Sequence, residues 1–157
     1  MTTAEPTPIR PPGPPDQTSA RAIVTALLES GNPVRFEPRG PSMRPTLRDG
    51  DTVLVHPATA RPPRRGDVLL VRRHGRLVLH RMLGRDGAGG IRLAADAALQ
   101  QVETVPADAV VGVASSRWRR GRERRLDRPL ARWSGLLRYA LRPLRRLAHR
   151  CRSALRR

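Results

Sequence analysis

The chain has 157 residues and a net charge of +18 at pH 7, from 31 basic side chains, all arginine, against 13 acids. This length allows one domain with tails, and 38% hydrophobic and 3% aromatic residues predict a modest, aliphatic core. Cys151 is the only cysteine, which excludes an intrachain disulfide and a cysteine-based metal site. Because the histidines also lack metal-ligand spacing with a carboxylate, we expect no metal or other cofactor.

The positive charge is concentrated in the last quarter of the chain. Residues 117–157 carry 16 arginines and two acids, a net charge of +14, whereas residues 1–116 carry +4. The use of arginine in place of lysine is typical of a GC-rich bacterial coding sequence, but that bias does not explain its placement. A polycationic tail predicts an anionic partner.

The first 17 residues are rich in proline and threonine and predict a disordered leader. They lack the basic-then-apolar pattern of a secretory signal, and no stretch approaches the length of a transmembrane helix. We therefore expect a cytoplasmic protein, or one held peripherally at the inner face of the membrane.

A helix and several strands are predicted next, over residues 18–116. Ser19 is a candidate cap for a helix over Ala20 to Ser30, and Gly31 is a candidate terminator. Turn-forming residues then separate short strand-like runs, and His74-Gly75 is predicted to be a hairpin tip. The fold class is therefore mainly β, a small barrel or folded sheet. The predicted strands are Val34–Glu37, Thr52–His56, Asp67–Arg72, Arg76–Leu83, Ile91–Ala94 and Ala109–Ala114.

Residues 117–157 are predicted to be an arginine-rich linker followed by a basic amphipathic helix from Pro129, kinked by Pro143. Apolar residues recur at three- and four-residue steps along this helix. Two partners fit residues 129–157 equally well: an anionic membrane surface or a partner helix. Nucleic acid is a weaker alternative, because no reading element is recognisable. The predicted stripe is Leu130, Trp133, Leu137, Ala140, Leu144, Leu147, Cys151 and Leu155.

The segment 40–51, Gly-Pro-Ser-Met-Arg-Pro-Thr-Leu-Arg-Asp-Gly-Asp, has the features of a nucleophile loop. A serine hydroxyl needs a base to remove its proton and donors to stabilise the oxyanion. Gly40 permits a tight backbone approach to Ser42, and Pro45 restrains the exit from the turn. With no lysine in the chain, a histidine has to be the base. His80 lies on a predicted strand whose alternation places Val78, His80 and Met82 on one face.

The order of motifs over residues 34–116 resembles the signal peptidase and LexA-type (S24–S26) serine peptidase superfamily. The resemblance rests on the Ser42 segment, the second Gly-Asp at Gly66-Asp67, and the following strand with His80-Arg81. Most of these peptidases carry Lys-Arg at the position of His80-Arg81. His80-Arg81 is similar to the histidine-base branch, the endoplasmic-reticulum and archaeal type.

The resemblance implies a role for each matching residue. Ser42 would be the nucleophile, His80 the general base, and Met43 the neighbour that packs under the substrate groove, which Gly40 and Pro45 support. Asp96 would assist the base, although Ala95-Asp96-Ala97 stands where the family has Gly-Asp-Asn.

The function that follows is a serine endopeptidase that cleaves a peptide or precursor protein through a Ser42–His80 dyad and an acyl-enzyme. Two alternatives remain open: a catalytically inactive peptide-binding module of the same fold, or a LexA-like regulator with a nucleic-acid-binding basic tail. Against the regulator, residues 1–33 contain one predicted helix rather than a helix-turn-helix. Of the other histidines, His56 and His74 are expected to be solvated, and His149 lies in the basic tail.

Overall fold

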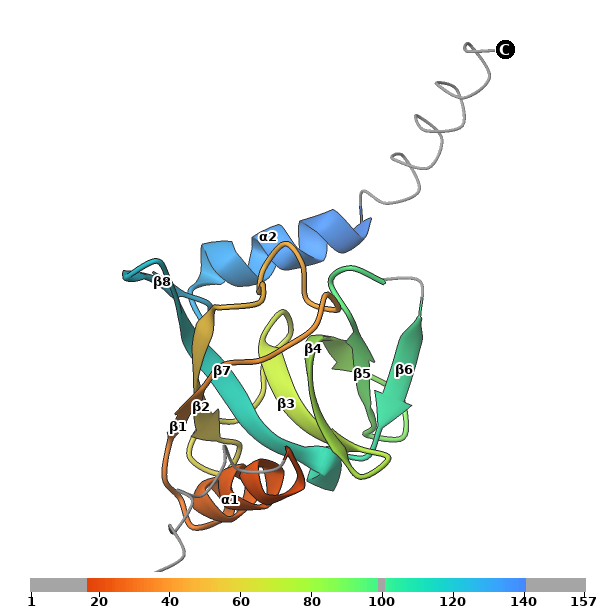
Figure 1. Ribbon diagram of the computed structural model, residues 1–157. Helices are drawn as coiled ribbons and strands as arrows, with labels where there is room; N and C mark the ends of the chain where they lie inside the picture. Colours follow the sequence, from red (N-terminus) through yellow and green to blue (C-terminus); the bar gives the residue numbers. More distant parts are fainter. Residues whose placement is uncertain (1–16, 99–100, 141–157) are drawn as a thin grey trace, which may run out of the picture.

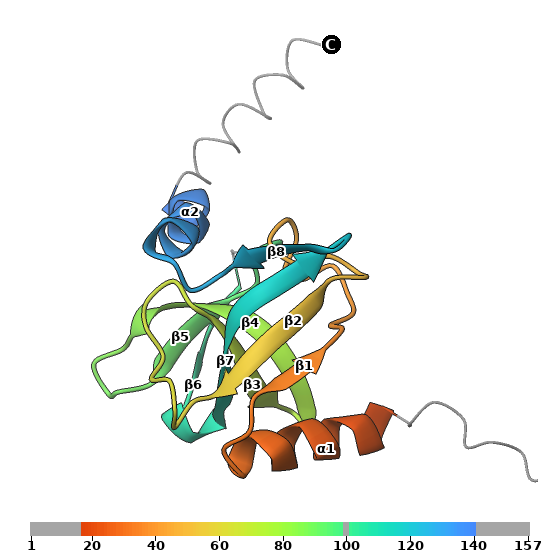
Figure 2. The same cartoon turned by 90° about the vertical axis from the view of Figure 1, so that its left-hand side faces the viewer.

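A computed structural model describes residues 17–98 and 101–140. An eight-stranded antiparallel sheet curls around its own core, with helix α1 (Gln17–Glu29) at one end and helix α2 (Pro129–Ala140) at the other (Figures 1 and 2). The sheet order is β1-β2-β7-β3-β4-β5-β6, with β8 paired to β7. The strands are β1 (Val34–Phe36), β2 (Thr52–Pro57), β3 (Val68–Arg73), β4 (Arg76–Arg85), β5 (Ile91–Ala94), β6 (Val102–Val105), β7 (Val110–Arg119) and β8 (Arg122–Arg125).

Strand β7 organises the sheet because it pairs with three other strands. Its first half lies between β2 and β3, and in its second half β8 takes the place of β3. Gly112 lies where the backbone of β2 comes very close: a Cβ at this position would be 2.5 Å from Val55 Cγ1 and 2.8 Å from the His56 carbonyl oxygen. A glycine is therefore required in this central strand.

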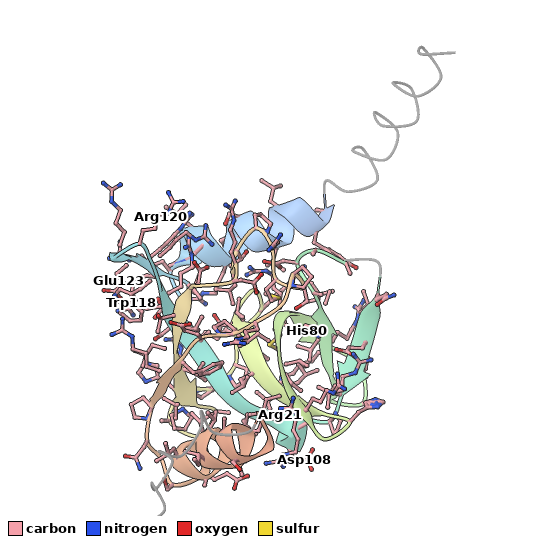
Figure 3. All side chains as sticks on the ribbon, in the orientation of Figure 1. Arg21, His80, Asp108, Trp118, Arg120 and Glu123 are labelled. Atoms are coloured by element: carbon pink, nitrogen blue, oxygen red, sulfur yellow. The ribbon has the colours of Figure 1, made fainter. Side chains whose placement is uncertain are left out.

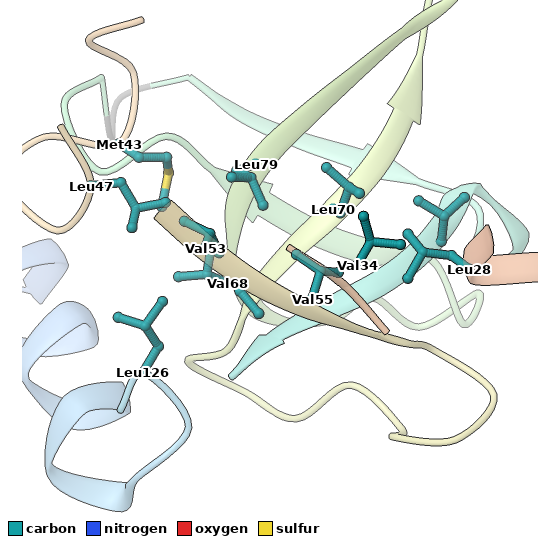
Figure 4. Close-up of a cluster of buried hydrophobic side chains, with 12 residues drawn as sticks. Leu28, Val34, Met43, Leu47, Val53, Val55, Val68, Leu70, Leu79 and Leu126 are labelled. Carbon is teal, nitrogen blue, oxygen red and sulfur yellow. The ribbon is translucent and has the colours of Figure 1, made fainter. Parts of the chain in front are cut away.

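The two faces of the central strands pack into separate apolar clusters. On β3, Val68 and Leu70 belong to the cluster shown in Figure 4, whereas Leu69 and Val71 belong to a second cluster with Met82 and Leu93. Burial on both faces explains why β3 reads as a continuous apolar run rather than an alternating one. The alternation predicted for β4 is confirmed, because Leu79 joins the first cluster and Met82 the second.

The predicted strands begin within one residue of the observed ones, but β6 and β8 were not predicted, and α1 begins earlier than expected. Gly31 has φ +89° and ends the helix as expected, and His74 (φ +46°) and Gly75 (φ +69°) form the tip of the β3–β4 hairpin. Ser19 does not cap the helix, because α1 begins at Gln17 and Ser19 lies inside it. The predicted leader falls almost wholly on residues 1–16, outside the described residues.

The prediction of a linker over residues 117–128 is wrong. The β7 strand continues to Arg119, turns, and pairs with β8, so that Ser116 lies opposite Arg125. Leu126 is 5% exposed and belongs to the apolar cluster of the Ser42 segment (Figure 4). This arginine-rich segment is part of the sheet because it pairs with β7, and composition alone cannot reveal such pairing.

Helix α2 packs on the sheet with residues that are not part of the predicted apolar stripe. Leu136 and Tyr139 contact Leu83 and Ala94, while Leu130, Trp133 and Leu137 are 85%, 67% and 56% exposed. The predicted stripe therefore points away from the domain, and its continuation beyond Ala140, with the Pro143 kink, lies outside the described residues. No helix in residues 17–98 and 101–140 has the length and apolar character needed to span a membrane.

Candidate active site

The Ser42 loop is an exposed segment held by buried anchors on either side of a turn. Ser42 is exposed, whereas Met43 and Leu47 are 3% and 2% exposed and pack into the cluster with Leu79 (Figure 4). The Leu47 amide also donates to the Met43 carbonyl oxygen at 2.9 Å. Burial of these two apolar side chains anchors the loop that follows Ser42, while Ser42 itself remains accessible.

Asp49 closes the loop by bonding to both sides of the serine. Its carboxylate accepts hydrogen bonds from the Gly40 amide at 2.7 Å and from Arg44 Nη2 at 2.9 Å. The Gly40 amide, followed by the Arg44 guanidinium, lowers the pKa of Asp49 below its ordinary value. Gly40 has φ +109°, a conformation that side chains other than glycine rarely adopt, and Pro45 follows a cis peptide bond.

A buried ion pair connects this loop to the sheet. Arg81 is 1% exposed and binds Asp96 through two contacts of 2.7 Å, from Nε to Oδ1 and from Nη2 to Oδ2. Thr46 Oγ1 donates to Asp96 Oδ2 and accepts from Arg81 Nη2 at 3.1 Å. The Ala97 amide donates to the Ser42 carbonyl oxygen at 2.8 Å. The loop is therefore bonded to the middle of β4 and to the turn after β5.

The carboxylate that binds His80 comes from β6. His80 Nδ1 lies 2.6 Å from Glu103 Oε1, and Arg73 Nε lies 2.8 Å from the other carboxylate oxygen, Glu103 Oε2. The side chains of His80 and Glu103 are 12% and 18% exposed, and Figure 3 shows His80 on the β4 side of the fold, far from Trp118 on β7. Since an ionised carboxylate only accepts, Nδ1 is the donor in this contact, and in the neutral ring Nε2 is then the acceptor.

The prediction that Asp96 assists the base is therefore corrected. The Asp96 carboxylate is bound by the neighbouring Arg81, and Glu103 takes the position on His80 that was assigned to Asp96. An arginine fork satisfies both oxygens of a buried carboxylate at once, which an imidazole cannot do. One sequence pattern could have pointed to Glu103. In Val-Glu-Thr-Val it is two residues from Val105, so both lie on one face of a strand, and Val105 is buried in the structure.

Ser42 and His80 come to the same end of the sheet without a direct bond. Ser42 is bonded to the turn after β5, and His80 lies on β4, which pairs with β5. Among the described residues, no hydrogen bond joins the Ser42 hydroxyl to the His80 ring.

A comparison with family models gives a match that covers most of the sheet. The model of a family described as Peptidase S24-like matches residues 21–114, more than half of the chain. The protein belongs to the Peptidase S24-like family. No curated protein and no solved structure matches the chain. The matched residues of the S24-like domain end within β7, so β8 and α2 lie beyond them.

The remaining histidines of the S24-like domain lie away from this arrangement. His74 is exposed at the hairpin tip, and His56 is half-buried and lines an open groove of about 690 Å³ with Ser115 and Ser116. His149 lies outside the described residues. Within residues 17–98 and 101–140, no group of three histidine, cysteine or acidic side chains is placed to hold a metal ion.

Proposed function

We propose that the protein is a serine endopeptidase in which Ser42 is the nucleophile, His80 the general base, and Glu103 the residue that orients the base. The observation that carries this proposal is the 2.6 Å contact between His80 Nδ1 and Glu103 Oε1, because the next residue along β4, Arg81, binds Thr46 of the Ser42 loop. A nucleophile, a base and a carboxylate that fixes the tautomer of the base are the working parts of a serine peptidase.

In the proposed reaction, Ser42 Oγ attacks the peptide carbonyl carbon as its proton moves to His80 Nε2. The resulting imidazolium is stabilised by the Glu103 carboxylate, and the C–N bond then breaks as His80 returns the proton to the leaving amine. Water, deprotonated by the same histidine, hydrolyses the acyl-enzyme. The Gly40 amide is already bonded to Asp49, so we assign the oxyanion to the Ser42 amide.

The proposed substrate is a peptide or precursor protein in an extended conformation. Ser42 is exposed and its neighbour Met43 is buried in the apolar cluster, which supports access of a peptide chain to the hydroxyl from outside the domain. The histidine in place of lysine supports membership of the histidine-base branch. The preference for small residues before the cleaved bond comes from the resemblance to signal peptidases.

The test is acylation of the full chain by a fluorophosphonate serine probe, measured by intact mass. Wild type is compared with Ser42→Ala, His80→Ala and Glu103→Gln. Ser30→Ala, an exposed serine at the end of α1, and His74→Asn, at the exposed hairpin tip, are the matched controls. We expect one probe adduct per wild-type chain, no adduct on Ser42→Ala, and a rate reduced about a hundredfold or more in His80→Ala.

Each outcome separates the candidate functions. Loss of labelling in Ser42→Ala and His80→Ala, with both controls labelled like wild type, supports the peptidase. No labelling of a folded wild-type chain contradicts it and favours a peptide-binding module that does not cleave. A LexA-like regulator is less well supported, because α1 is the single helix that precedes β1 in the described residues.

A further inference from the structure

Helix α2 presents an apolar face that the domain does not cover. Leu130, Trp133 and Leu137 follow one another at three- and four-residue steps and are more than half exposed. The helix is not loosely attached, because Gly135 packs on Arg81 and Leu136 on the sheet. The exposed face is therefore a fixed feature of the fold rather than the result of an undocked helix.

Beside this face lies a cavity of about 530 Å³ between the Ser42 loop, the β7–β8 hairpin and α2. Leu137 belongs both to the cavity wall and to the apolar face, so the two features are continuous. We call this cavity the arginine pocket, because five of the residues that line it are arginines: Arg48, Arg81, Arg117, Arg119 and Arg124.

The arginine pocket has an excess of positive charge. Two carboxylates form ion pairs with its arginines: Asp96 pairs with Arg81, and Asp51 pairs with Arg119 at 2.6 Å and with Arg117 at 3.8 Å. Five positive charges against these two leave a surplus of three. Among the described residues, no carboxylate forms an ion pair with the guanidinium of Arg48 or Arg124.

The surplus is concentrated around a buried guanidinium. The Arg117 side chain is 11% exposed, and Arg124 lies directly opposite it in the β7–β8 register. Burial, followed by the positive charges of Arg119 and Arg124, lowers the pKa of Arg117 although Asp51 acts against them. An anion in the pocket would relieve this repulsion.

We propose that the arginine pocket binds the phosphate of an anionic phospholipid while Leu130, Trp133 and Leu137 enter the membrane interface. Guanidinium groups bind phosphate oxygens in bidentate fashion, and tryptophan is enriched where lipid headgroups meet acyl chains. A soluble anion would account for the pocket but would leave the apolar face in water. An anionic bilayer satisfies both adjoining features. Docking in this way would hold the Ser42 loop, which supplies Thr46 to the pocket, close to the membrane surface.

The test is cosedimentation of the full chain with vesicles. One set is phosphatidylcholine alone, and the other is phosphatidylcholine and phosphatidylglycerol in equal parts. Arg124→Gln removes a pocket charge, and Arg122→Gln removes an equal charge from the same strand outside the pocket. Trp133→Ala removes an apolar side chain from the exposed face of α2. Its control, Ile23→Ala, removes an exposed apolar side chain from α1.

We expect wild type to bind the anionic vesicles and not the neutral ones. Arg124→Gln and Trp133→Ala should each reduce partitioning about fivefold, and the two controls by less than about twofold. Equal losses for Arg124→Gln and Arg122→Gln would overturn the proposal, since any basic surface would then suffice. Binding of inorganic phosphate or a DNA duplex without vesicle binding would also overturn it. Ser42→Ala should bind vesicles like wild type, so failure of the peptidase proposal would leave this result unchanged.

Discussion

Replacing Gly135 with alanine has two effects on stability that act in opposite directions: a gain in helix propensity and a steric clash. In an isolated helix the change should stabilise α2 by about 1 kcal/mol, because glycine is a poor helix former. In the folded protein, however, a Cβ on residue 135 would be 2.5 Å from Arg81 Nη1 and closer still to the centre of the guanidinium. One of the two groups has to move.

Movement of Arg81 is costly because its side chain is held on several sides. It binds Asp96 through two 2.7 Å contacts and the Gly66 carbonyl oxygen through a third, and it is 1% exposed. Disrupting a buried ion pair costs about 3–5 kcal/mol. If α2 lifts instead, Leu136 loses its packing on the sheet. The net expectation for Gly135→Ala is a loss of about 2–4 kcal/mol, or on the order of 10 °C in Tm.

The measurement is urea unfolding of wild type and Gly135→Ala followed by circular dichroism. Leu130→Ala is the control, because it alters the same helix at a side chain that is 85% exposed and should change the unfolding free energy by less than about 0.5 kcal/mol. If Gly135→Ala is more stable than wild type by about 1 kcal/mol, helix propensity alone governs the site. The packing of α2 on Arg81 would then be refuted.

Three further predictions concern the Ser42 loop and its supports. Although burial raises the pKa of Asp51, hydrogen bonds from Arg119 and the Arg48 amide outweigh it, so the pKa lies below 3.8. The stability contributed by Asp51 is therefore present above about pH 4 and lost as the pH falls below it, and Asp51→Asn should flatten that acid limb in urea unfolding. Gly40→Ala should slow probe labelling at least about tenfold because φ is +109°, whereas Gly87→Ala, at an open turn, should not change it. Thr46→Val should slow labelling while leaving Tm within a few degrees of the wild-type value. Labelling at the wild-type rate would show that the Arg81–Asp96 ion pair does not support the Ser42 loop.

Local patterns in the sequence were enough to predict the fold class and the Ser42 loop. Three of these patterns depend only on residues close by in the sequence, so their structural effect can be predicted without the fold. They are the His74-Gly75 turn, the period-2 alternation around His80 and the terminator Gly31. The grouping of Gly40, Ser42 and Pro45 likewise predicts a constrained turn around the serine. The structure has Ser42 exposed and Met43 buried beside it.

The tertiary structure decided which groups pair across long distances in the chain. Glu103 lies 23 residues from His80, and competition with Arg81 removes Asp96 from the same role. Strand β8 is formed by exposed charged residues and exists because β7 offers unpaired backbone groups beside it.

The face that α2 turns toward the sheet was also decided by packing rather than by its pattern. The pattern predicts an apolar stripe without saying which face meets the sheet. In the structure, Gly135 faces Arg81 and Arg132 lies against Gly66, while Leu137 is exposed. A helix docks where backbone and buried charge fit most closely. The sequence alone therefore identified an amphipathic helix, and the steric fit at Gly135 determined that Leu130, Trp133 and Leu137 remain exposed.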